Sequence, residues 1–406
     1  MKRRKFLEQL ALTTGGMLIP IGKQSWVARG ANQVTNPQRL VVIFLRGAID
    51  GLNVVVPHQE TDYYDLRPSI SIPYPEEPEG VIDLDGFFGL HPALSDLVPL
   101  WKQKNLAFIY NCGSNDATRS HFDAQDYMES GTPGIKSTPD GWMNRLLANL
   151  PTDRLTQALN VGVTTPRILQ GKMAVANLRP GKNSLHKLPV DQPLIHQAFT
   201  RLYNDNSDLA QAYRKGVEAR EIIMAELNKE MLSASGNANS VNGFVGDAKK
   251  VGKLMYGDTR TQLAFMNIGG WDTHVGEKKI LNLFLAHLGQ GLVTLIKELD
   301  HVYANTAIAV ISEFGRTVKE NGNQGTDHGH GNVMWLLGGG IRGGQIYGKW
   351  EGLGESILYE GRDLPVTTDF REVISSILVN HIAISQSKLG NIFPGYKFQN
   401  SLNLIK

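Results

Sequence analysis

The sequence predicts an α/β protein with a mostly parallel central sheet. Short apolar segments that suit buried strands alternate with longer segments in which leucines recur at helical spacing. Ionisable residues gather directly after several of the apolar segments, and open α/β sheets place their ligand sites at the carboxyl ends of strands. A length of 406 residues is enough for one large domain or two ordinary ones.

The first predicted strand spans residues 40–45, a near-continuous apolar run that suits burial on both faces. It leads into the sequence RGAIDGLN, where Asp50 follows the strand and glycines 47 and 51 allow a sharp turn. The segment HPALSDLVPLWKQKN has helical spacing, and LAFIY after it suits a second strand. A further helix is expected to begin near Ser120 and to end at Gly131, with Ser as N-cap and Gly at the C-terminus.

The later segments also alternate between predicted strands and predicted helices, although the sequence patterns are weaker between residues 140 and 260. A strand in TQLAFMNIGG precedes a long helix whose leucine stripe runs from Leu281 to Leu299, and TAIAVISEF and NVMWLL suit two more strands. The other expected helices lie near 141–149, 193–232, 245–256 and 367–380, the last capped by Thr368 or Asp369. The region 193–256 is therefore expected to be a helical insertion.

Composition limits the function classes. The apolar fraction of 41% and the charged fraction of 20% are typical of a globular protein, and a net charge of +2 gives no general attraction to nucleic acid. The single cysteine, Cys112, excludes a disulfide within the chain and a cysteine-rich zinc site. A metal site would have to use His, Asp and Glu.

The N-terminal sequence MKRRKFLEQLALTTGGMLIPIG resembles a twin-arginine export signal, because Arg3 and Arg4 precede a mildly apolar stretch. That stretch is too short and too interrupted to span a bilayer. A basic amphipathic first helix is the alternative. We expect residues 1–31 to be the signal segment and 32–406 a single domain, exported to the periplasm or beyond by the twin-arginine machinery.

Four groups of polar residues follow predicted strands or begin the helix after one. They are Asp50; Arg119, Ser120 and His121; Asp272 and His274; and Arg316, Asp327, His328 and His330 together with Glu313. Such carboxylates and imidazoles suit a divalent metal such as Zn, Mn, Mg or Ca. Each group also has a plainer interpretation: Asp50 as a turn residue, Asp272 as an N-cap, TDHGHG as a solvated loop and Ser120 as a cap only.

A metal beside the helix start would change what Ser120 can do. The ion and the helix dipole would both favour an alkoxide and stabilise a neighbouring phosphate or sulfate. Arg119 or Arg316 could then hold the anion's oxygens with two parallel hydrogen bonds.

Six segments carry a family resemblance: FLRGAIDGLNVVVP, HPALSDL, RSHFDAQDYMESG, GGWDTH, SEFGRT and GTDHGHGNVMWLLGGG. Together they resemble the bacterial domain-of-unknown-function 1501 family within the alkaline phosphatase and sulfatase superfamily, over residues from about 40 to 380. The resemblance implies a three-layer α/β/α fold, Asp50 as first metal ligand and Ser120 as nucleophile, with His121 as a rival one residue later. Further ligands would be Asp272, His274, Glu313, and His328 or His330.

The chain departs from the superfamily pattern in two places. Glu313 and Phe314 stand where an Asp-His pair is usual, which weakens a second metal site, and no Cys-x-Pro-x-Arg sequence precedes the helix, which argues against formylglycine chemistry. The resemblance implies an exported metal-dependent hydrolase of a phosphate or sulfate ester with a Ser nucleophile. The alternative is a non-catalytic exported binding or accessory protein on the same fold.

Overall fold

The computed structural model describes residues 37–151, 157–162, 164–178, 180, 193–218, 243–258 and 260–406. Within it, Gln38–Lys406 form one compact unit. The predicted signal segment, residues 1–31, lies outside the described residues.

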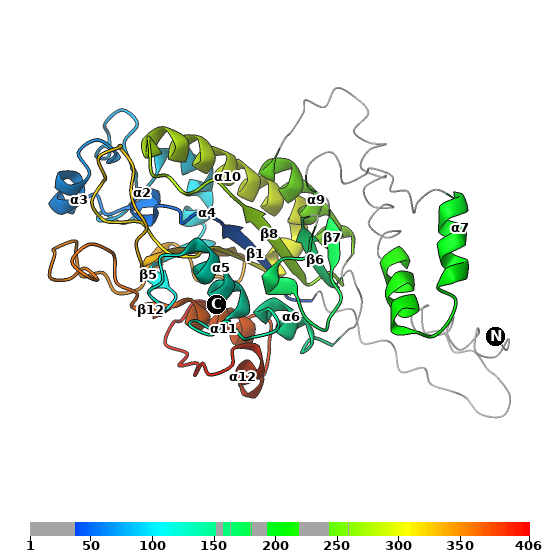
Figure 1. The fold of residues 1–406 in the computed structure, drawn as a ribbon. Helices are drawn as coiled ribbons and strands as arrows, with labels where there is room; N and C mark the ends of the chain where they lie inside the picture. The colour runs from blue at the N-terminus through cyan, green and yellow to red at the C-terminus, as the bar shows by residue number, and fades with distance from the viewer. Residues whose placement is uncertain are drawn as a thin grey trace, which may run out of the picture. The chain divides into compact units, whose positions relative to one another are not determined.

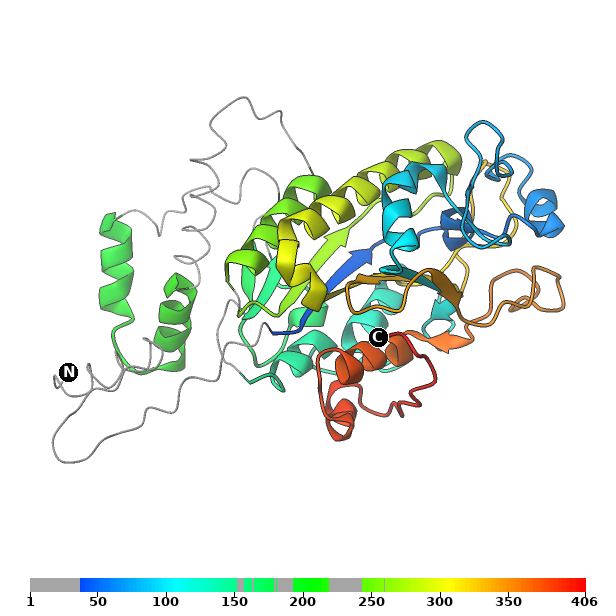
Figure 2. The ribbon, with the colours of Figure 1, turned by 180° about the vertical axis from the view of Figure 1, so that it is seen from behind.

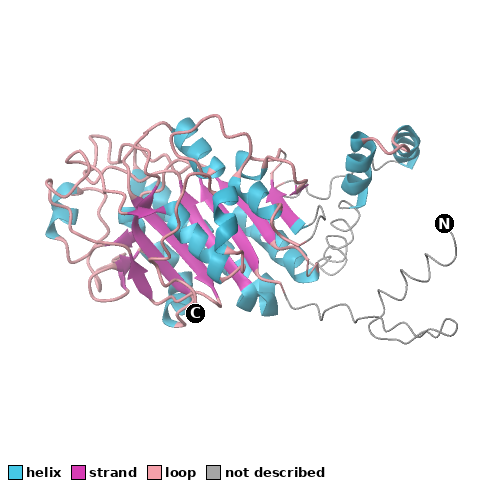
Figure 3. Cartoon of the chain, turned by 90° about the horizontal axis from the view of Figure 1, so that it is seen from below, coloured by secondary structure: helices cyan, strands magenta, loops and turns pink. Residues whose placement is uncertain are grey.

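The centre of this unit is a nine-stranded sheet, whose strands lie side by side in Figure 3. Its order is β11-β5-β10-β9-β1-β8-β6-β7, with β12 also paired to β5. The strands are β1 (Arg39–Leu45), β5 (Leu106–Gly113), β6 (Ala158–Val161), β7 (Ala176–Leu178), β8 (Leu263–Ile268), β9 (Thr306–Ser312), β10 (Asn332–Gly338), β11 (Gln345–Tyr347) and β12 (Thr368–Asp369). Only β10, among the described strands of this sheet, runs antiparallel to its neighbours. The predicted mostly parallel sheet is therefore confirmed.

Helices cover both faces of the sheet, which gives the expected three layers (Figures 1 and 2). On one face, the apolar core contains residues of α9 (Phe244–Gly257), α10 (Glu277–Leu299) and η1 (Pro92–Leu97). On the other, it contains residues of α5 (His121–Ser130), α6 (Trp142–Leu147), α11 (Phe370–Asn380) and α12 (Leu389–Ile392). Strand β1 contributes side chains to both cores, because alternate residues of a strand point to opposite faces of the sheet. Val41 lies in the first core and Val42 in the second.

The remaining elements are short. They are α2 (Gly51–Val54), α3 (Thr61–Leu66), α4 (Val98–Lys102), α7 (Pro193–Leu202), η3 (Arg167–Leu169), η6 (Asp300–Asn305), η7 (Gln386–Lys388) and a small sheet of β2 (Val55–Val56), β4 (Gly89–Leu90) and β3 (Ile82–Asp83).

Helix α10 resembles a membrane span in its length and composition. Glu277–Asn305 is the one stretch among the described residues that is long and apolar enough to cross a bilayer. Six of its leucines are buried in the core over the sheet, namely Leu281, Leu285, Leu288, Leu292, Leu295 and Leu299, whereas Leu283 is exposed. That is the position of a core helix in an α/β fold.

Two expected helices are interrupted. The segment after His91 forms the 3-10 helix η1 and then α4, because Leu94 has non-helical dihedral angles and Pro99 lacks a backbone N–H. The expected helix 193–232 is broken after α7, and residues 208–218 form a second helix. Asp205 accepts hydrogen bonds from both the backbone N–H and the hydroxyl of Ser207, a local bond that competes with the helix. Residues 219–232 lie outside the described part of the chain.

Candidate metal centre

Three side chains from distant parts of the sequence meet at the carboxyl ends of the parallel strands. His121 begins α5, Asp272 follows β8, and His328 lies in the loop between β9 and β10. The Nε2 atoms of His121 and His328 are 3.0 Å apart, and Asp272 lies 3.4 Å from the first and 3.2 Å from the second. One ligand atom from each residue lies within 4.8 Å of the others, as a shared metal ion would require.

His274 brings a further imidazole to this group. Its Nε2 lies 3.0 Å from Nε2 of His328 and 3.0 Å from Oδ1 of Asp272. The four residues His121, Asp272, His274 and His328 are called the His/Asp cluster below. Its donor set is three imidazoles and one carboxylate.

The other nitrogen of each imidazole has an acceptor behind it. The Nδ1 contacts are His121 with Glu313 Oε1 at 2.8 Å, His328 with the Arg119 carbonyl at 2.9 Å, and His274 with Asp327 Oδ1 at 3.1 Å. A carbonyl or an ionised carboxylate can only accept a hydrogen bond, so each Nδ1 carries the proton. In a neutral imidazole the Nε2 atom then presents a lone pair toward the cluster.

The carboxylates of the site are held in their ionised form. Burial acts to raise the pKa of Glu313, but hydrogen bonds from His121 and Gln125 outweigh it and lower the pKa. The same balance lowers the pKa of Asp327, where Asn321 and His274 donate, and of Asp272, where Arg316 donates at 2.7 Å. Three ionised carboxylates thus surround the imidazoles.

A divalent cation fits this arrangement. Three Nε2 lone pairs directed toward one another and toward a carboxylate repel when nothing lies between them. A cation turns the same contacts into favourable ones, and carboxylates or carbonyls behind metal-bound imidazoles are the usual support of such ligands. Because imidazoles dominate, the donor set suits Zn or a similar transition metal better than Mg or Ca.

One side of the cluster, at Glu313 and Arg316, is buried, and the other side, at Asp272 and His274, is exposed to solvent. Glu313 and Arg316 have fully buried side chains, whereas 43% of the Asp272 side chain and 39% of the His274 side chain are exposed. Phe314, directly after Glu313, stacks on His121 with ring centroids 4.9 Å apart. The rear of the site is therefore fixed, and a ligand could approach from the side of Asp272 and His274.

Close backbone approach explains two of the glycines. Gly47 has φ of +116°, and a Cβ atom there would lie 2.6 Å from the backbone nitrogen of Asp272. Its N–H donates to Glu313 at 2.8 Å. At Gly329 a Cβ would lie 2.5 Å from the backbone of Arg316, where the loop folds back on itself. The glycine-rich loop thus brings His328 close to the strand ends.

Asp50, expected as the first ligand, lies in a separate ionic group. Both of its oxygens bond to the Arg67 guanidinium, at 2.5 and 3.1 Å, and both side chains are buried. Burial acts to raise the pKa of Asp50, but Arg67 lowers it below its usual range. The guanidinium of Arg67 thus supplies the positive charge that Asp50 requires.

Glu277 shares this buried group. Its oxygens accept hydrogen bonds from Thr273, Thr326 and Asn53. Burial and the charge of Asp50 raise the pKa of Glu277 well above its usual range, which favours the protonated form that bonds to Asp50. Thr326 also accepts from Arg316 at 3.0 Å, which links the buried group to the support of Asp272.

The raised pKa of Glu277 predicts a pH dependence of stability. Above about pH 4.5 the unfolded state releases this proton while the folded state retains it, so stability declines as pH rises toward the folded pKa. Glu277→Gln mimics the protonated acid and removes this decline. We expect urea unfolding between pH 5 and 8 to show wild type losing stability relative to the variant. Parallel curves for the two proteins would contradict a protonated Glu277.

The other predicted residues are placed as follows. Ser120 is the N-cap of α5, its oxygen accepting from the Asp123 N–H at 3.5 Å. Arg119 donates to Asp363 at 2.6 Å and to Glu360 at 2.6 Å. His330 does not join the cluster; it is buried against Tyr359, with ring centroids 4.7 Å apart. Glu313 and Asp327, expected as ligands, lie behind His121 and His274.

Sequence reasoning missed several supporting residues. Gln125 lies four positions after His121 on α5 and donates to Glu313 at 2.8 Å, a helical spacing that could have indicated it. Arg362 donates to the His328 carbonyl at 2.7 Å, and no local signal in the sequence pointed to it. Arg67 and Glu277 were likewise without a signal, since their partners are set by the fold.

The comparison with protein-family models matches the family that the six sequence segments resemble. A family model described as "Protein of unknown function (DUF1501)" matches residues 37–388. A search of curated proteins finds no match.

Three solved structures illustrate the fold similarity. The C-terminal periplasmic domain of EcEptC from Escherichia coli, in complex with Zn, is 10% identical over 75% of this chain and 74% of that one, with a TM-score of 0.35. Lipoteichoic acid synthase LtaP from Listeria monocytogenes is 8% identical over 82% and 75%, with a TM-score of 0.35. Alkaline phosphatase from the Antarctic bacterium TAB5 is 10% identical over 77% and 95%, with a TM-score of 0.30. At such values the likeness carries no argument about chemistry.

Proposed function

Because this chain belongs to the DUF1501 family, whose description names no function, we propose from its site that it is an exported metal-dependent hydrolase of a phosphate or sulfate ester. The observation that carries the proposal is that the Nε2 atoms of His121, His274 and His328 converge on Asp272, at 3.4, 3.0 and 3.2 Å from its carboxylate oxygens. Export rests on Arg3 and Arg4. Its test is whether an Arg3→Lys/Arg4→Lys variant remains in the cytoplasm.

The metal would be held by His121, Asp272, His274 and His328. When bound, it would supply positive charge that stabilises the developing anion of an ester under attack. One ion per chain is expected, because Asp50 already has both oxygens bonded to Arg67. Zn fits the imidazole-rich donor set best, and Mn, Mg and Ca are the other candidates.

Ser120 is the proposed nucleophile. Its backbone immediately precedes His121, and among the described residues its hydroxyl has one long hydrogen bond, accepted from the Asp123 N–H at 3.5 Å. The position at the start of α5 favours negative charge on the hydroxyl oxygen and on a bound ester group.

The two candidate arginines have different roles in this proposal. Arg316 is buried and donates to Asp272 and Thr326. It therefore positions the proposed metal ligand Asp272 and does not contact a substrate. Arg119 is partly exposed, and its Nη1 makes no hydrogen bond with the described residues. It is the arginine that can contact an ester oxygen. Its positive charge is partly balanced by the ion pairs with Asp363 and Glu360.

Two substitutions at Ser120 separate catalysis from helix capping. Ser120→Ala removes both the hydroxyl and the cap, whereas Ser120→Asn retains a good capping side chain. If Ser120 attacks the ester, both variants lose at least about 1,000-fold in turnover of p-nitrophenyl phosphate or sulfate, and only Ser120→Ala loses stability. Unchanged turnover in Ser120→Asn would show that water attacks the ester directly.

A non-catalytic exported binding or accessory protein is the second candidate. The observation in its favour is that Arg67 stands at Asp50, so that the first expected metal ligand is unavailable to an ion. Stoichiometric metal with no turnover across a panel of phosphate and sulfate esters would favour it. Turnover that disappears with the metal would exclude it.

A further inference from the structure

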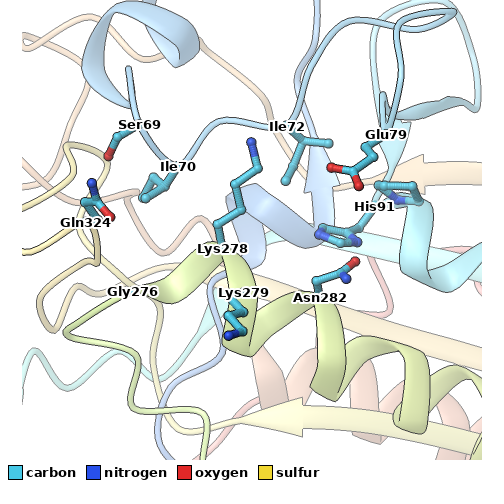
Figure 4. Close-up of a pocket in the computed structure, with 11 residues that line it drawn as sticks. Ser69, Ile70, Ile72, Glu79, His91, Gly276, Lys278, Lys279, Asn282 and Gln324 are labelled. Atoms are coloured by element: carbon cyan, nitrogen blue, oxygen red, sulfur yellow. The ribbon is translucent and has the colours of Figure 1, made fainter.

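A cavity of about 470 Å³ lies beside the start of α10 (Figure 4). Its polar lining includes Ser69, Glu79, His91, Lys278, Lys279 and Asn282. None of the four residues of the His/Asp cluster lines it. The cavity is therefore a second candidate site, formed by the start of α10, the loop after α3 and the residue before η1.

His91 presents an unpaired donor to this cavity. Its side chain is only 2% exposed, and its Nδ1 accepts from the Ala93 N–H at 3.1 Å, so the proton of the neutral ring lies on Nε2. Burial, with the charge of Lys278, lowers the pKa of His91 to about 4, which keeps the ring neutral at neutral pH. Nε2 makes no hydrogen bond with the described residues.

Two lysines add positive charge to the lining of the cavity, and their side chains point in opposite directions (Figure 4). Lys278 donates to the Ser71 carbonyl at 3.1 Å, which holds its side chain over the cavity. Lys279 is exposed and makes no ion pair with residues in the described part of the chain. Both lie in the first turn of the 23-residue helix α10, where the helix dipole also favours an anion.

Two acceptors lie beside His91. Glu79 contributes a carboxylate, and Asn282 an amide from the second turn of α10 (Figure 4). The two lysines outweigh the one acid, so the lining is net positive. A ligand that satisfied both kinds of group would carry an anionic group with hydroxyl groups attached to the same small molecule.

We propose that this cavity binds a small hydroxylated organic anion. A phosphate, sulfate or carboxylate lies between Lys278 and the Nε2–H of His91, Lys279 adds positive charge to the lining, and hydroxyls donate to Glu79 and Asn282. The volume is within the range of small-molecule sites and exceeds that of an inorganic anion. The site goes beyond the proposed hydrolysis, because it uses none of the cluster residues.

Calorimetric titration tests the proposal, with glucose 6-phosphate as the probe and inorganic phosphate and glucose as its parts. The titrations use the His121→Ala/His328→Ala protein, in which the cluster has lost two donors. We expect glucose 6-phosphate to bind more tightly than either part. The Kd is expected to rise at least tenfold in the same background with Lys278→Ala/Lys279→Ala added.

Two further variants complete the test. His91→Asn keeps an oxygen for the Ala93 N–H but removes the Nε2–H, and is expected to weaken binding several-fold. Lys297→Ala, at the other end of α10, leaves the Kd unchanged. Binding that is absent, or equal in all variants, overturns the proposal, as does binding seen in wild type but lost in the cluster variant. Loss of ester turnover in the cluster variant bears on the proposed hydrolysis alone.

Discussion

Replacing Arg67 by methionine is expected to lower the free energy of unfolding by about 3–5 kcal/mol. Arg67 and Asp50 are both almost completely buried, and the guanidinium bonds to both Asp50 oxygens. Arg67 also donates to the backbone carbonyls of Thr317 and Val318, at 2.8 and 2.7 Å. Its loss leaves an uncompensated buried carboxylate and two unsatisfied acceptors, which is more costly than the loss of the ion pair itself.

The measurement is urea unfolding with two comparison proteins. Asp50→Asn/Arg67→Met removes the unpaired charge and is expected to recover a substantial part of the stability. Arg260→Met, at an exposed arginine 3.6 Å from Asp258, is expected to cost at most about 1 kcal/mol. A cost below 1 kcal/mol for Arg67→Met would mean that Asp50 is not held as a buried anion by this residue.

Asp272→Asn is expected to reduce ester turnover at least about 100-fold, the second large effect. Asp272 is the one carboxylate within the cluster and contacts all three of its imidazoles. The amide has no negative charge and weakens the hold on a cation. Glu313 supports the ligand His121 through the contact with its Nδ1. Glu313→Gln weakens this support and is expected to lower metal affinity by about 10- to 100-fold.

Metal titration and turnover of p-nitrophenyl esters give the two readouts. The control is Asp300→Asn, an exposed carboxylate just after α10, for which neither readout is expected to change. If Asp272→Asn kept wild-type metal affinity and turnover, the cluster would not be the reacting site. If Glu313→Gln exceeded Asp272→Asn in effect, the assignment of Glu313 as a support would be wrong.

Local patterns predicted much of the fold because they arise from burial and from the backbone itself. The apolar run in β1 indicated a strand buried on both faces, and all seven of its residues are buried. Ser120 and Gly131 marked the two ends of α5 correctly, Gly131 taking φ of +71°. The expected helix 193–232 is interrupted at residues 205–207, where the side chain of Asp205 accepts two hydrogen bonds from Ser207. Helical spacing alone does not indicate such side-chain bonds.

The site was harder to predict, because its contacts join residues far apart in the sequence. Asp272, His274 and His328 are predicted as ligands from their positions after strands, whereas His121, at the helix start, is predicted as a rival of Ser120 for the nucleophile position. The distinction between a ligand and its support was not visible, since Glu313 and Asp327 have the same chemistry as ligands. The pairing of Asp50 with Arg67 depends on the loop after α3, whose path the sequence does not indicate.

Metal analysis by mass spectrometry tests the cluster most directly, comparing wild type with His121→Ala/His328→Ala. Both proteins are purified without chelators and shown by circular dichroism to be folded. We predict about one divalent ion per chain in wild type and a loss of that ion in the variant. Wild-type protein without metal after incubation with Zn or Mn, or equal metal in both proteins, would contradict a metal centre at Asp272.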